Sequence, residues 1–182
     1  MAAPTPASQS QSQSQPPRLY FAYGSNLSLT QMLSPTTGRC PTATYHSVGM
    51  LRHWRWLIGE RGYANIVPSA ADVVYGLLYT LQPADERVLD RAEGVPWAYQ
   101  KIAMQVSSLS GLAALERECE VEALVYVDGL RLGEGVIWPE YVARMNRGIG
   151  DALAKGVPLE YVEKYLRPFV KEEGQGEVDE EG

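Results

Sequence analysis

Residues 20–27, YFAYGSNL, constrain the fold more than any other stretch of this chain. The apolar and aromatic residues 18–23 predict a β-strand, and residues 27–33 (LSLTQML) predict a short helix. Residues 24–26 then form the tight turn between them. Because glycine tolerates a positive φ and Ser or Asn can cap the helix, we expect free backbone N–H groups to point at one spot above the strand. Such a spot binds an anionic group, although the same pattern also describes an ordinary capped turn.

The composition predicts one folded domain with a polar tail at each end. Of the 182 residues, 45% are hydrophobic and 21% are charged, which suits a single core. Residues 1–17 are rich in Ser, Gln and Pro and carry no charged side chain, so they are expected to be disordered. Residues 171–182 hold six acids and one lysine, −5 of the net charge of −6, and are also expected to be disordered. The folded domain is therefore expected over residues 18–170.

Charge and apolar patterning exclude several classes of partner. The near-neutral domain has no basic stripe for nucleic acid. No apolar run reaches the length of a membrane span and the N-terminus lacks the features of a signal peptide, so we expect no membrane partner and a cytoplasmic location. Cys40 and Cys119 are too few and too far apart for a disulfide framework or a zinc site. His46 and His53 do not have a metal-ligand spacing, so no metal is expected.

The remaining pattern predicts mostly strands, followed by helices. Strands are expected over residues 46–58, 64–67, 73–81, 100–108 and 119–127, with a helix over residues 83–93. Trp54 and Trp56 fall on one face of their strand, near a possible bulge, and are expected in the core. Tyr126 falls on the polar face of its strand. Pro139 and Pro158 each begin a helix.

Glu93 lies in the last turn of the helix expected over residues 83–93. The negative end of the helix dipole disfavours an ionised carboxylate there. If the side chain also turns into an apolar pocket, desolvation raises its pKa further, as suits a proton carrier near neutral pH. The alternative is a surface glutamate at a frayed helix end.

Three motifs, in this order, resemble those of the γ-glutamylcyclotransferase family: YFAYGSNL at residues 20–27, RAEGV at residues 91–95 and GVPLEYVEKYL at residues 156–166. Members of that family release an amino acid from a γ-glutamyl donor by closing the glutamyl group into 5-oxoproline. The resemblance covers nearly all of the expected domain. It implies an α+β fold, a small closed mixed β-barrel of about five to six strands with flanking helices, and a site at the barrel mouth. It also implies a homodimer.

The resemblance further implies roles for particular residues. Glu93 matches the family's general base and acid, and Tyr141 falls where the family has a tyrosine that contacts substrate. The loop that holds the γ-glutamyl group, largely through backbone N–H donors, corresponds to Tyr20, Phe21, Ala22, Tyr23, Gly24, Ser25 and Asn26. Tyr99 and Tyr126 look like the other phenols of the pocket.

A single carboxylate is sufficient for this chemistry. Glu93 would take a proton from the α-ammonium of a small γ-glutamyl substrate and, after ring closure, hand it to the leaving nitrogen. Neither a metal nor a cofactor is required for these steps.

Two alternatives stay open. The bulky Trp97 and the poor match of residues 36–63 lie where the leaving amine is expected, so the donor could be a γ-glutamylamine or a γ-glutamylated or glutathione-conjugated metabolite. A non-catalytic binding module, with the turn as a carboxylate pocket, is the alternative of another class. Glu93 argues against it, because binding alone gains nothing from a poised carboxylate.

Overall fold

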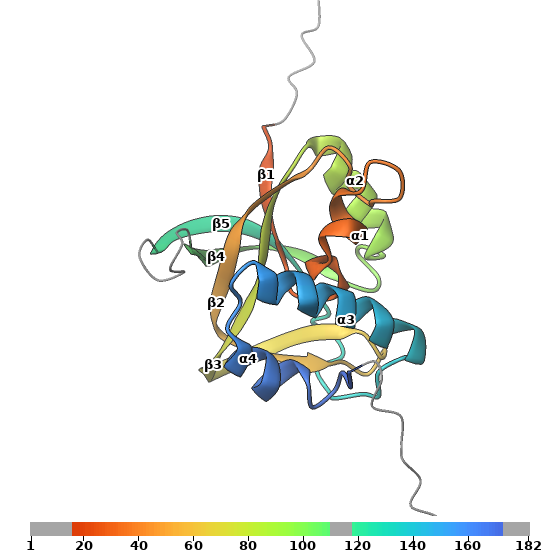
Figure 1. Cartoon of the computed structure of the whole chain (residues 1–182), viewed down its shortest axis with the longest axis vertical. Helices are drawn as coiled ribbons and strands as arrows, with labels where there is room; N and C mark the ends of the chain where they lie inside the picture. Colours follow the sequence, from red (N-terminus) through yellow and green to blue (C-terminus); the bar gives the residue numbers. More distant parts are fainter. Residues whose placement is uncertain (1–15, 110–117, 173–182) are drawn as a thin grey trace, which may run out of the picture.

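The computed structural model describes residues 16–109 and 118–172. Five strands within them close into a barrel in the order β1-β3-β2-β4-β5 (Figure 1): β1 (Arg18–Ala22), β2 (Thr44–Ile58), β3 (Ala64–Leu81), β4 (Gln100–Leu109) and β5 (Glu118–Val127). Neighbouring strands are antiparallel except β1 and β5, whose parallel pairing closes the ring. The predicted fold class, a small closed mixed barrel with flanking helices, is therefore confirmed. Of the predicted tails, residues 1–15 and 173–182 lie outside the described residues.

Strand β3 runs without a break, so the prediction of two strands over residues 64–67 and 73–81 is wrong. Pro68 has no N–H to donate to a ladder, which favoured a break at this point. In the structure Pro68 pairs with Trp54, directly after a register shift in β2. The bulge that was predicted as possible in β2 thus accommodates the proline, and the ladder continues on both sides of it.

Phe21 of β1 fills the core beside two glycines. Gly49 and Gly76 pair with each other in the β2–β3 ladder, and a Cβ on either would lie 2.8 Å from Phe21 Cε2. The side chains of Phe21 and Ala22 are completely buried. This packing fixes the end of β1 and therefore the position of the turn that follows it.

Trp56 ties β2 to the same turn. It is buried, as predicted, whereas Trp54 is only partly buried. The indole nitrogen of Trp56 donates to the carbonyl oxygen of Tyr23 over 2.9 Å, and its ring meets the ring of Phe169 edge-on with centroids 5.7 Å apart. The turn after β1 is consequently held by both the barrel wall and a buried hydrogen bond.

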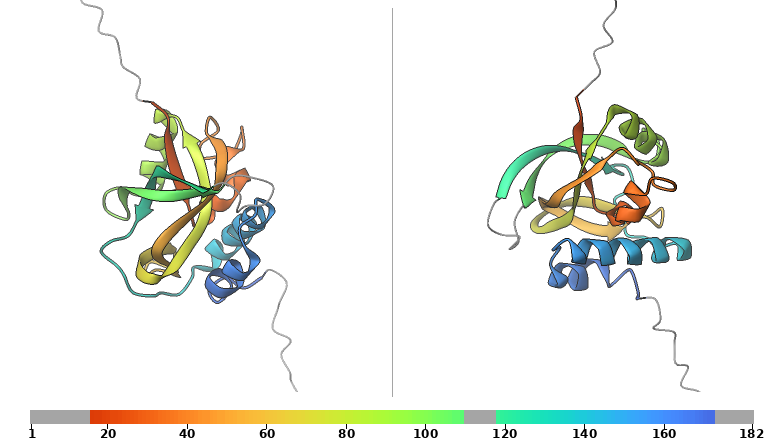
Figure 2. Two further views of the ribbon diagram at one scale, coloured as in Figure 1. Left: turned by 90° about the vertical axis from the view of Figure 1, so that its left-hand side faces the viewer. Right: turned by 45° about the horizontal axis from the view of Figure 1, so that its top comes forward.

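The helices gather at two places on the barrel (Figures 1 and 2). One group lies along one side of the barrel and consists of α3 (Pro139–Ala154), α4 (Leu159–Tyr161) and the π-helical turn η2 (Val162–Leu166). The other group lies near the other end, where α2 (Pro83–Ala92) is close to α1 (Leu29–Leu33). In the described ranges 16–109 and 118–172, no helix is both long and apolar enough to cross a bilayer.

The helix predicted over residues 27–33 begins earlier and is interrupted. A 3-10 turn, η1 (Ser25–Leu27), precedes Ser28, whose backbone is extended. The hydroxyl of Ser28 accepts from the backbone nitrogen of Gln31 at 3.3 Å and so caps α1. Capping is thus provided by Ser28, and Ser25 and Asn26 are left to line a cavity.

Candidate active site

A cavity of about 290 Å³ opens between the β1–η1 turn, the C-terminal end of α2 and the first turn of α3. All of the residues predicted for the site line it except Phe21 and Ala22, whose side chains lie in the core. Trp97 is 83% exposed and is not part of the lining. Within the described part of the chain, no three His, Cys, Asp or Glu side chains cluster as metal ligands do.

Glu93 is placed by the end of α2. Its backbone N–H donates to the carbonyl of Leu89 at 2.8 Å, and Gly94 follows in a left-handed conformation (φ 63°) that ends the helix. The Glu93 side chain is only 18% exposed, and burial raises its pKa above the ordinary glutamate value. Arg39, whose Nη1 lies 3.6 Å from Oε1, and Asn26 act in the opposite direction by stabilising the ionised form. Glu93 therefore holds a proton more readily than a surface glutamate does.

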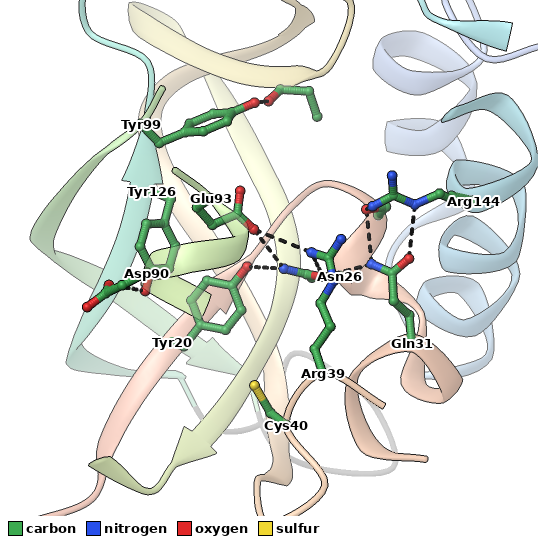
Figure 3. Close-up of polar contacts among 12 residues, drawn as sticks. Tyr20, Asn26, Gln31, Arg39, Cys40, Asp90, Glu93, Tyr99, Tyr126 and Arg144 are labelled. Carbon is green, nitrogen blue, oxygen red and sulfur yellow. Dashed lines mark hydrogen bonds and ion pairs between the residues drawn. The ribbon is translucent and has the colours of Figure 1, made fainter. Parts of the chain in front are cut away.

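Asn26 connects the turn to Glu93 (Figure 3). Its Nδ2 donates to Glu93 Oε1 at 3.2 Å and to the Tyr20 hydroxyl at 2.9 Å. Its Oδ1 accepts from Arg39 Nη1 at 3.0 Å and from Gln31 Nε2 at 2.8 Å. Because arginine can only donate, Arg39 fixes the amide with its oxygen toward the guanidinium and its nitrogen toward the carboxylate.

The turn is closed by Tyr141 from the first turn of α3. The backbone N–H of Ser25 donates to the Tyr141 hydroxyl at 3.0 Å. The prediction of a free N–H in the turn is therefore wrong for Ser25. Gly24 does not take a positive φ, since its φ is −110°. It is needed for space, because a Cβ there would lie 2.8 Å from the Tyr141 oxygen.

Buried phenols surround Glu93. Burial raises the pKa of Tyr20, Tyr23, Tyr99, Tyr126 and Tyr141, so all of these side chains are neutral near pH 7. The hydroxyl of Tyr99 donates to the carbonyl of Ala64 at 2.9 Å. Neutral phenols can orient a substrate through hydrogen bonds without adding charge to the cavity.

The placement of Tyr126 on a polar face was wrong. It is 3% exposed: its ring meets the Tyr20 ring with centroids 5.6 Å apart, and its hydroxyl donates to Asp90 Oδ1 of α2 at 2.8 Å. Asp90 also pairs with Lys101 at 2.8 Å. The alternation of polar residues in the N-terminal half of the strand does not continue to its end, where both faces are buried.

Three arginines of the lining were not predicted: Arg39, Arg61 and Arg144. Arg144 Nη2 donates to Ser25 Oγ at 2.8 Å and its Nε donates to Gln31 Oε1 at 3.1 Å. Arg144 could have been found by its helical spacing from Tyr141, whereas Arg39 and Arg61 lie in the segment that matched the family poorly. Because Glu93 is the one carboxylate that residues 16–109 and 118–172 contribute to the lining, the cavity favours an anionic ligand.

Comparisons with known proteins point to one family. The model of the family "Gamma-glutamyl cyclotransferase, AIG2-like" matches residues 20–138. The gamma-glutamylcyclotransferases of Bos taurus and Homo sapiens are 30% and 29% identical over 174 residues, covering 90% of this chain and 84% of each relative. A solved structure of a gamma-glutamyl cyclotransferase has a TM-score of 0.69 and 27% identity, covering 91% of this chain and 95% of that one. This chain therefore belongs to the gamma-glutamyl cyclotransferase, AIG2-like family and is an enzyme of that class, a cyclising lyase.

Proposed function

We propose that this enzyme cyclises the γ-glutamyl group of a γ-glutamyl amino acid or peptide to 5-oxoproline, with Glu93 as the general base and then the general acid. The observation that carries the proposal is the place of Glu93, a mostly buried carboxylate of raised pKa and, among the residues that the structure describes, the one acid in the lining of the cavity. A carboxylate in this setting suits proton transfer near neutral pH.

Glu93 Oε2 is the oxygen proposed for proton transfer. The contacts with Asn26 and Arg39 are both made by Oε1, and Figure 3 shows the other carboxylate oxygen pointing away from Asn26. Oε2 takes a proton from the α-ammonium of the substrate, and the neutral amine attacks the γ-carbonyl carbon. As the bond to the leaving nitrogen breaks, that proton passes from Glu93 to the leaving nitrogen. The restored carboxylate then removes the second proton from the ring nitrogen and passes it to the released amine, which leaves as an ammonium while the ring nitrogen keeps one N–H.

The turn and α3 are proposed to hold the α-carboxylate of the γ-glutamyl group. The Tyr141 hydroxyl accepts from the Ser25 N–H and keeps its own proton to donate, and Arg144 brings positive charge to the same turn. Fixing the α-carboxylate on one side of Glu93 brings the α-nitrogen and the γ-carbonyl together. Such positioning in an intramolecular reaction can contribute about 7–11 kcal/mol.

The proposal is tested by measuring 5-oxoproline release from γ-glutamyl-alanine, ε-(γ-glutamyl)lysine and glutathione. The wild type is compared with Glu93→Gln, which keeps the size of the side chain and removes the proton carrier. We expect the loss of general base and acid to lower kcat by about 10²–10⁴-fold. Retained activity in Glu93→Gln contradicts the role of Glu93. If a folded wild type turns over none of the three donors, calorimetry with the same compounds tests the binding-module alternative.

The homodimer implied by the family resemblance stays a prediction. Light scattering tests it, and a monomer at micromolar concentration contradicts it.

A further inference from the structure

Arg61 differs from the other arginines of the cavity in having an unsatisfied donor. It lies in the turn between β2 and β3, and its Nη1 is buried and forms no hydrogen bond within residues 16–109 and 118–172. Arg39 and Arg144, in contrast, donate to Asn26 and to Gln31 and Ser25. A guanidinium that lines a cavity and donates no hydrogen bond to the described residues is available to an anionic ligand.

The nearest carboxylate is already occupied. Arg61 Nη1 lies 3.9 Å from Asp128 Oδ2, too far for a hydrogen bond. The same Oδ2 accepts from Arg131 Nε at 3.1 Å, while Oδ1 accepts from the backbone nitrogens of Leu130 and Arg131 at 3.2 and 3.1 Å. Asp128 therefore holds Arg131 and its own loop and gives the Arg61 guanidinium no hydrogen bond. The Arg61 side chain is 34% exposed and lines the cavity, so the accessible part of its guanidinium is left for another anion.

Arg61 is held in place before any ligand arrives. Its guanidinium carbon lies 5.2 Å from the centroid of the Tyr99 ring, a cation–π contact. Its carbonyl oxygen accepts from the indole nitrogen of Trp138 at 2.8 Å. The next residue, Gly62, has a φ of 77° and could not carry a Cβ, which would lie 2.7 Å from the same nitrogen. The side chain thus loses little freedom when it binds.

The position of Arg61 points to the leaving part of the substrate. Arg61 stacks on Tyr99, and Figure 3 shows Tyr99 on the opposite side of Glu93 from Arg39. Arg144 lies at the turn, where the α-carboxylate is proposed to bind. A second anion therefore has its own cation, Arg61 beside Tyr99, separate from Arg144 at the turn.

We propose that Arg61 binds a carboxylate of the released amine, so that the preferred donors are γ-glutamyl amino acids and peptides rather than γ-glutamylamines without a carboxylate. This inference rests on the function proposed above. A guanidinium matches a carboxylate through paired N–H donors, which makes arginine selective for it. The charge of the cavity lining favours the same donors. A γ-glutamyl amino acid carries one more negative charge than a γ-glutamylamine, and the lining offers it three guanidinium groups.

The test removes the carboxylate from the substrate and the guanidinium from the enzyme in turn. We compare kcat/KM for 5-oxoproline release from γ-glutamyl-alanine and γ-glutamyl-alaninamide, which differ only in carboxylate and carboxamide. The wild type is expected to prefer the carboxylate by about tenfold to a hundredfold, the effect of a hydrogen bond to a charged group. Arg61→Gln loses this preference through a higher KM for γ-glutamyl-alanine, with the alaninamide little changed. Arg61→Lys keeps the positive charge but lacks the paired N–H donors of the guanidinium, so it should retain part of the preference for γ-glutamyl-alanine.

Arg55→Gln is the matched control. Arg55 lies in the same hairpin but pairs with Glu134 at the surface, at 2.7 Å, and is not part of the cavity lining. It should keep the full preference of the wild type. If Arg61→Gln does not fold, the inference is tested by Arg61→Lys alone, in which the preference for γ-glutamyl-alanine over γ-glutamyl-alaninamide should be reduced.

The outcomes separate this inference from the proposed function. Equal kcat/KM of the wild type on both donors, or an undiminished preference in Arg61→Gln or Arg61→Lys, overturns the inference and leaves the cyclisation standing. A wild type that releases no 5-oxoproline from either donor overturns both.

Discussion

Asn26 Nδ2 lies 3.2 Å from Glu93 Oε1 and joins the turn after β1 to the end of α2. Arg39 sets the orientation of this amide, because it donates to Asn26 Oδ1 at 3.0 Å and cannot accept. The contact holds one oxygen of the carboxylate and leaves the other for a substrate. Changes at either residue are therefore expected to alter proton transfer more than folding.

The pH dependence of activity should follow Glu93. Burial raises its pKa, and the proposed reaction begins with the ionised carboxylate, so kcat/KM is expected to fall as the pH drops through that raised value. The acidic limb of the pH profile should therefore lie above the range of an ordinary glutamate. A limb at the ordinary value contradicts this assignment.

The same shift predicts a pH-dependent stability. The folded state binds the Glu93 proton more tightly than the unfolded state does, so between the two pKa values the folded state carries more protons. The free energy of unfolding of the wild type should then decrease, relative to Glu93→Gln, as the pH rises through this window. Urea unfolding of both proteins across the window measures the difference, and a difference that does not vary with pH refutes the raised pKa.

Asn26→Asp should move the acidic limb to higher pH. The substitution places a second carboxylate where the Nδ2 atom now lies, 3.2 Å from Glu93 Oε1, and like charges at this distance disfavour ionisation. The pH profile of 5-oxoproline release measures the shift. Asn146→Asp adds the same charge on α3 beside Arg167, outside the lining, and should leave the profile unchanged. A limb that stays in place or moves to lower pH in Asn26→Asp contradicts the geometry.

Gly24→Ala should destabilise the protein through Tyr141. The added Cβ would lie 2.8 Å from the Tyr141 hydroxyl, and overpacking of this kind costs about 1–3 kcal/mol. In a Tyr141→Phe background the oxygen is absent, so the cost should be smaller. A double-mutant cycle by urea unfolding measures this coupling. Equal costs in both backgrounds would show that the hydroxyl is not the obstacle.

Tyr126 and Tyr141 should respond differently to loss of the hydroxyl. Tyr126 donates to Asp90 at 2.8 Å, so Tyr126→Phe is expected to lower the free energy of unfolding by about 1.5 kcal/mol, with little effect on KM. Tyr141→Phe removes a group at the proposed carboxylate site and should raise KM by about tenfold. Thermal or urea unfolding and steady-state kinetics on both variants distinguish the two roles, and a larger kinetic loss in Tyr126→Phe would reverse them.

Local patterns in the sequence were enough to predict several parts of the molecule. The resemblance of three motifs to the family implied the barrel class. The strand and turn of residues 20–27 and the position of Glu93 at a helix end follow from periodicity and capping within short stretches. These features depend on neighbours in the chain, which is why one sequence reveals them. The continuity of β3 through Pro68 does not, because it depends on a bulge in the facing strand.

The sequence by itself determined the fold class and the one carboxylate on which the proposed chemistry rests. Only the tertiary structure decided which groups surround that carboxylate. Arg39, Arg61 and Arg144 come from three segments far apart in the chain and meet in one cavity because the barrel closes and α3 packs against the turn. The burial that raises the pKa of Glu93 and the hydrogen bond from Asn26 to Glu93 likewise arise from contacts between distant segments, which no local pattern records.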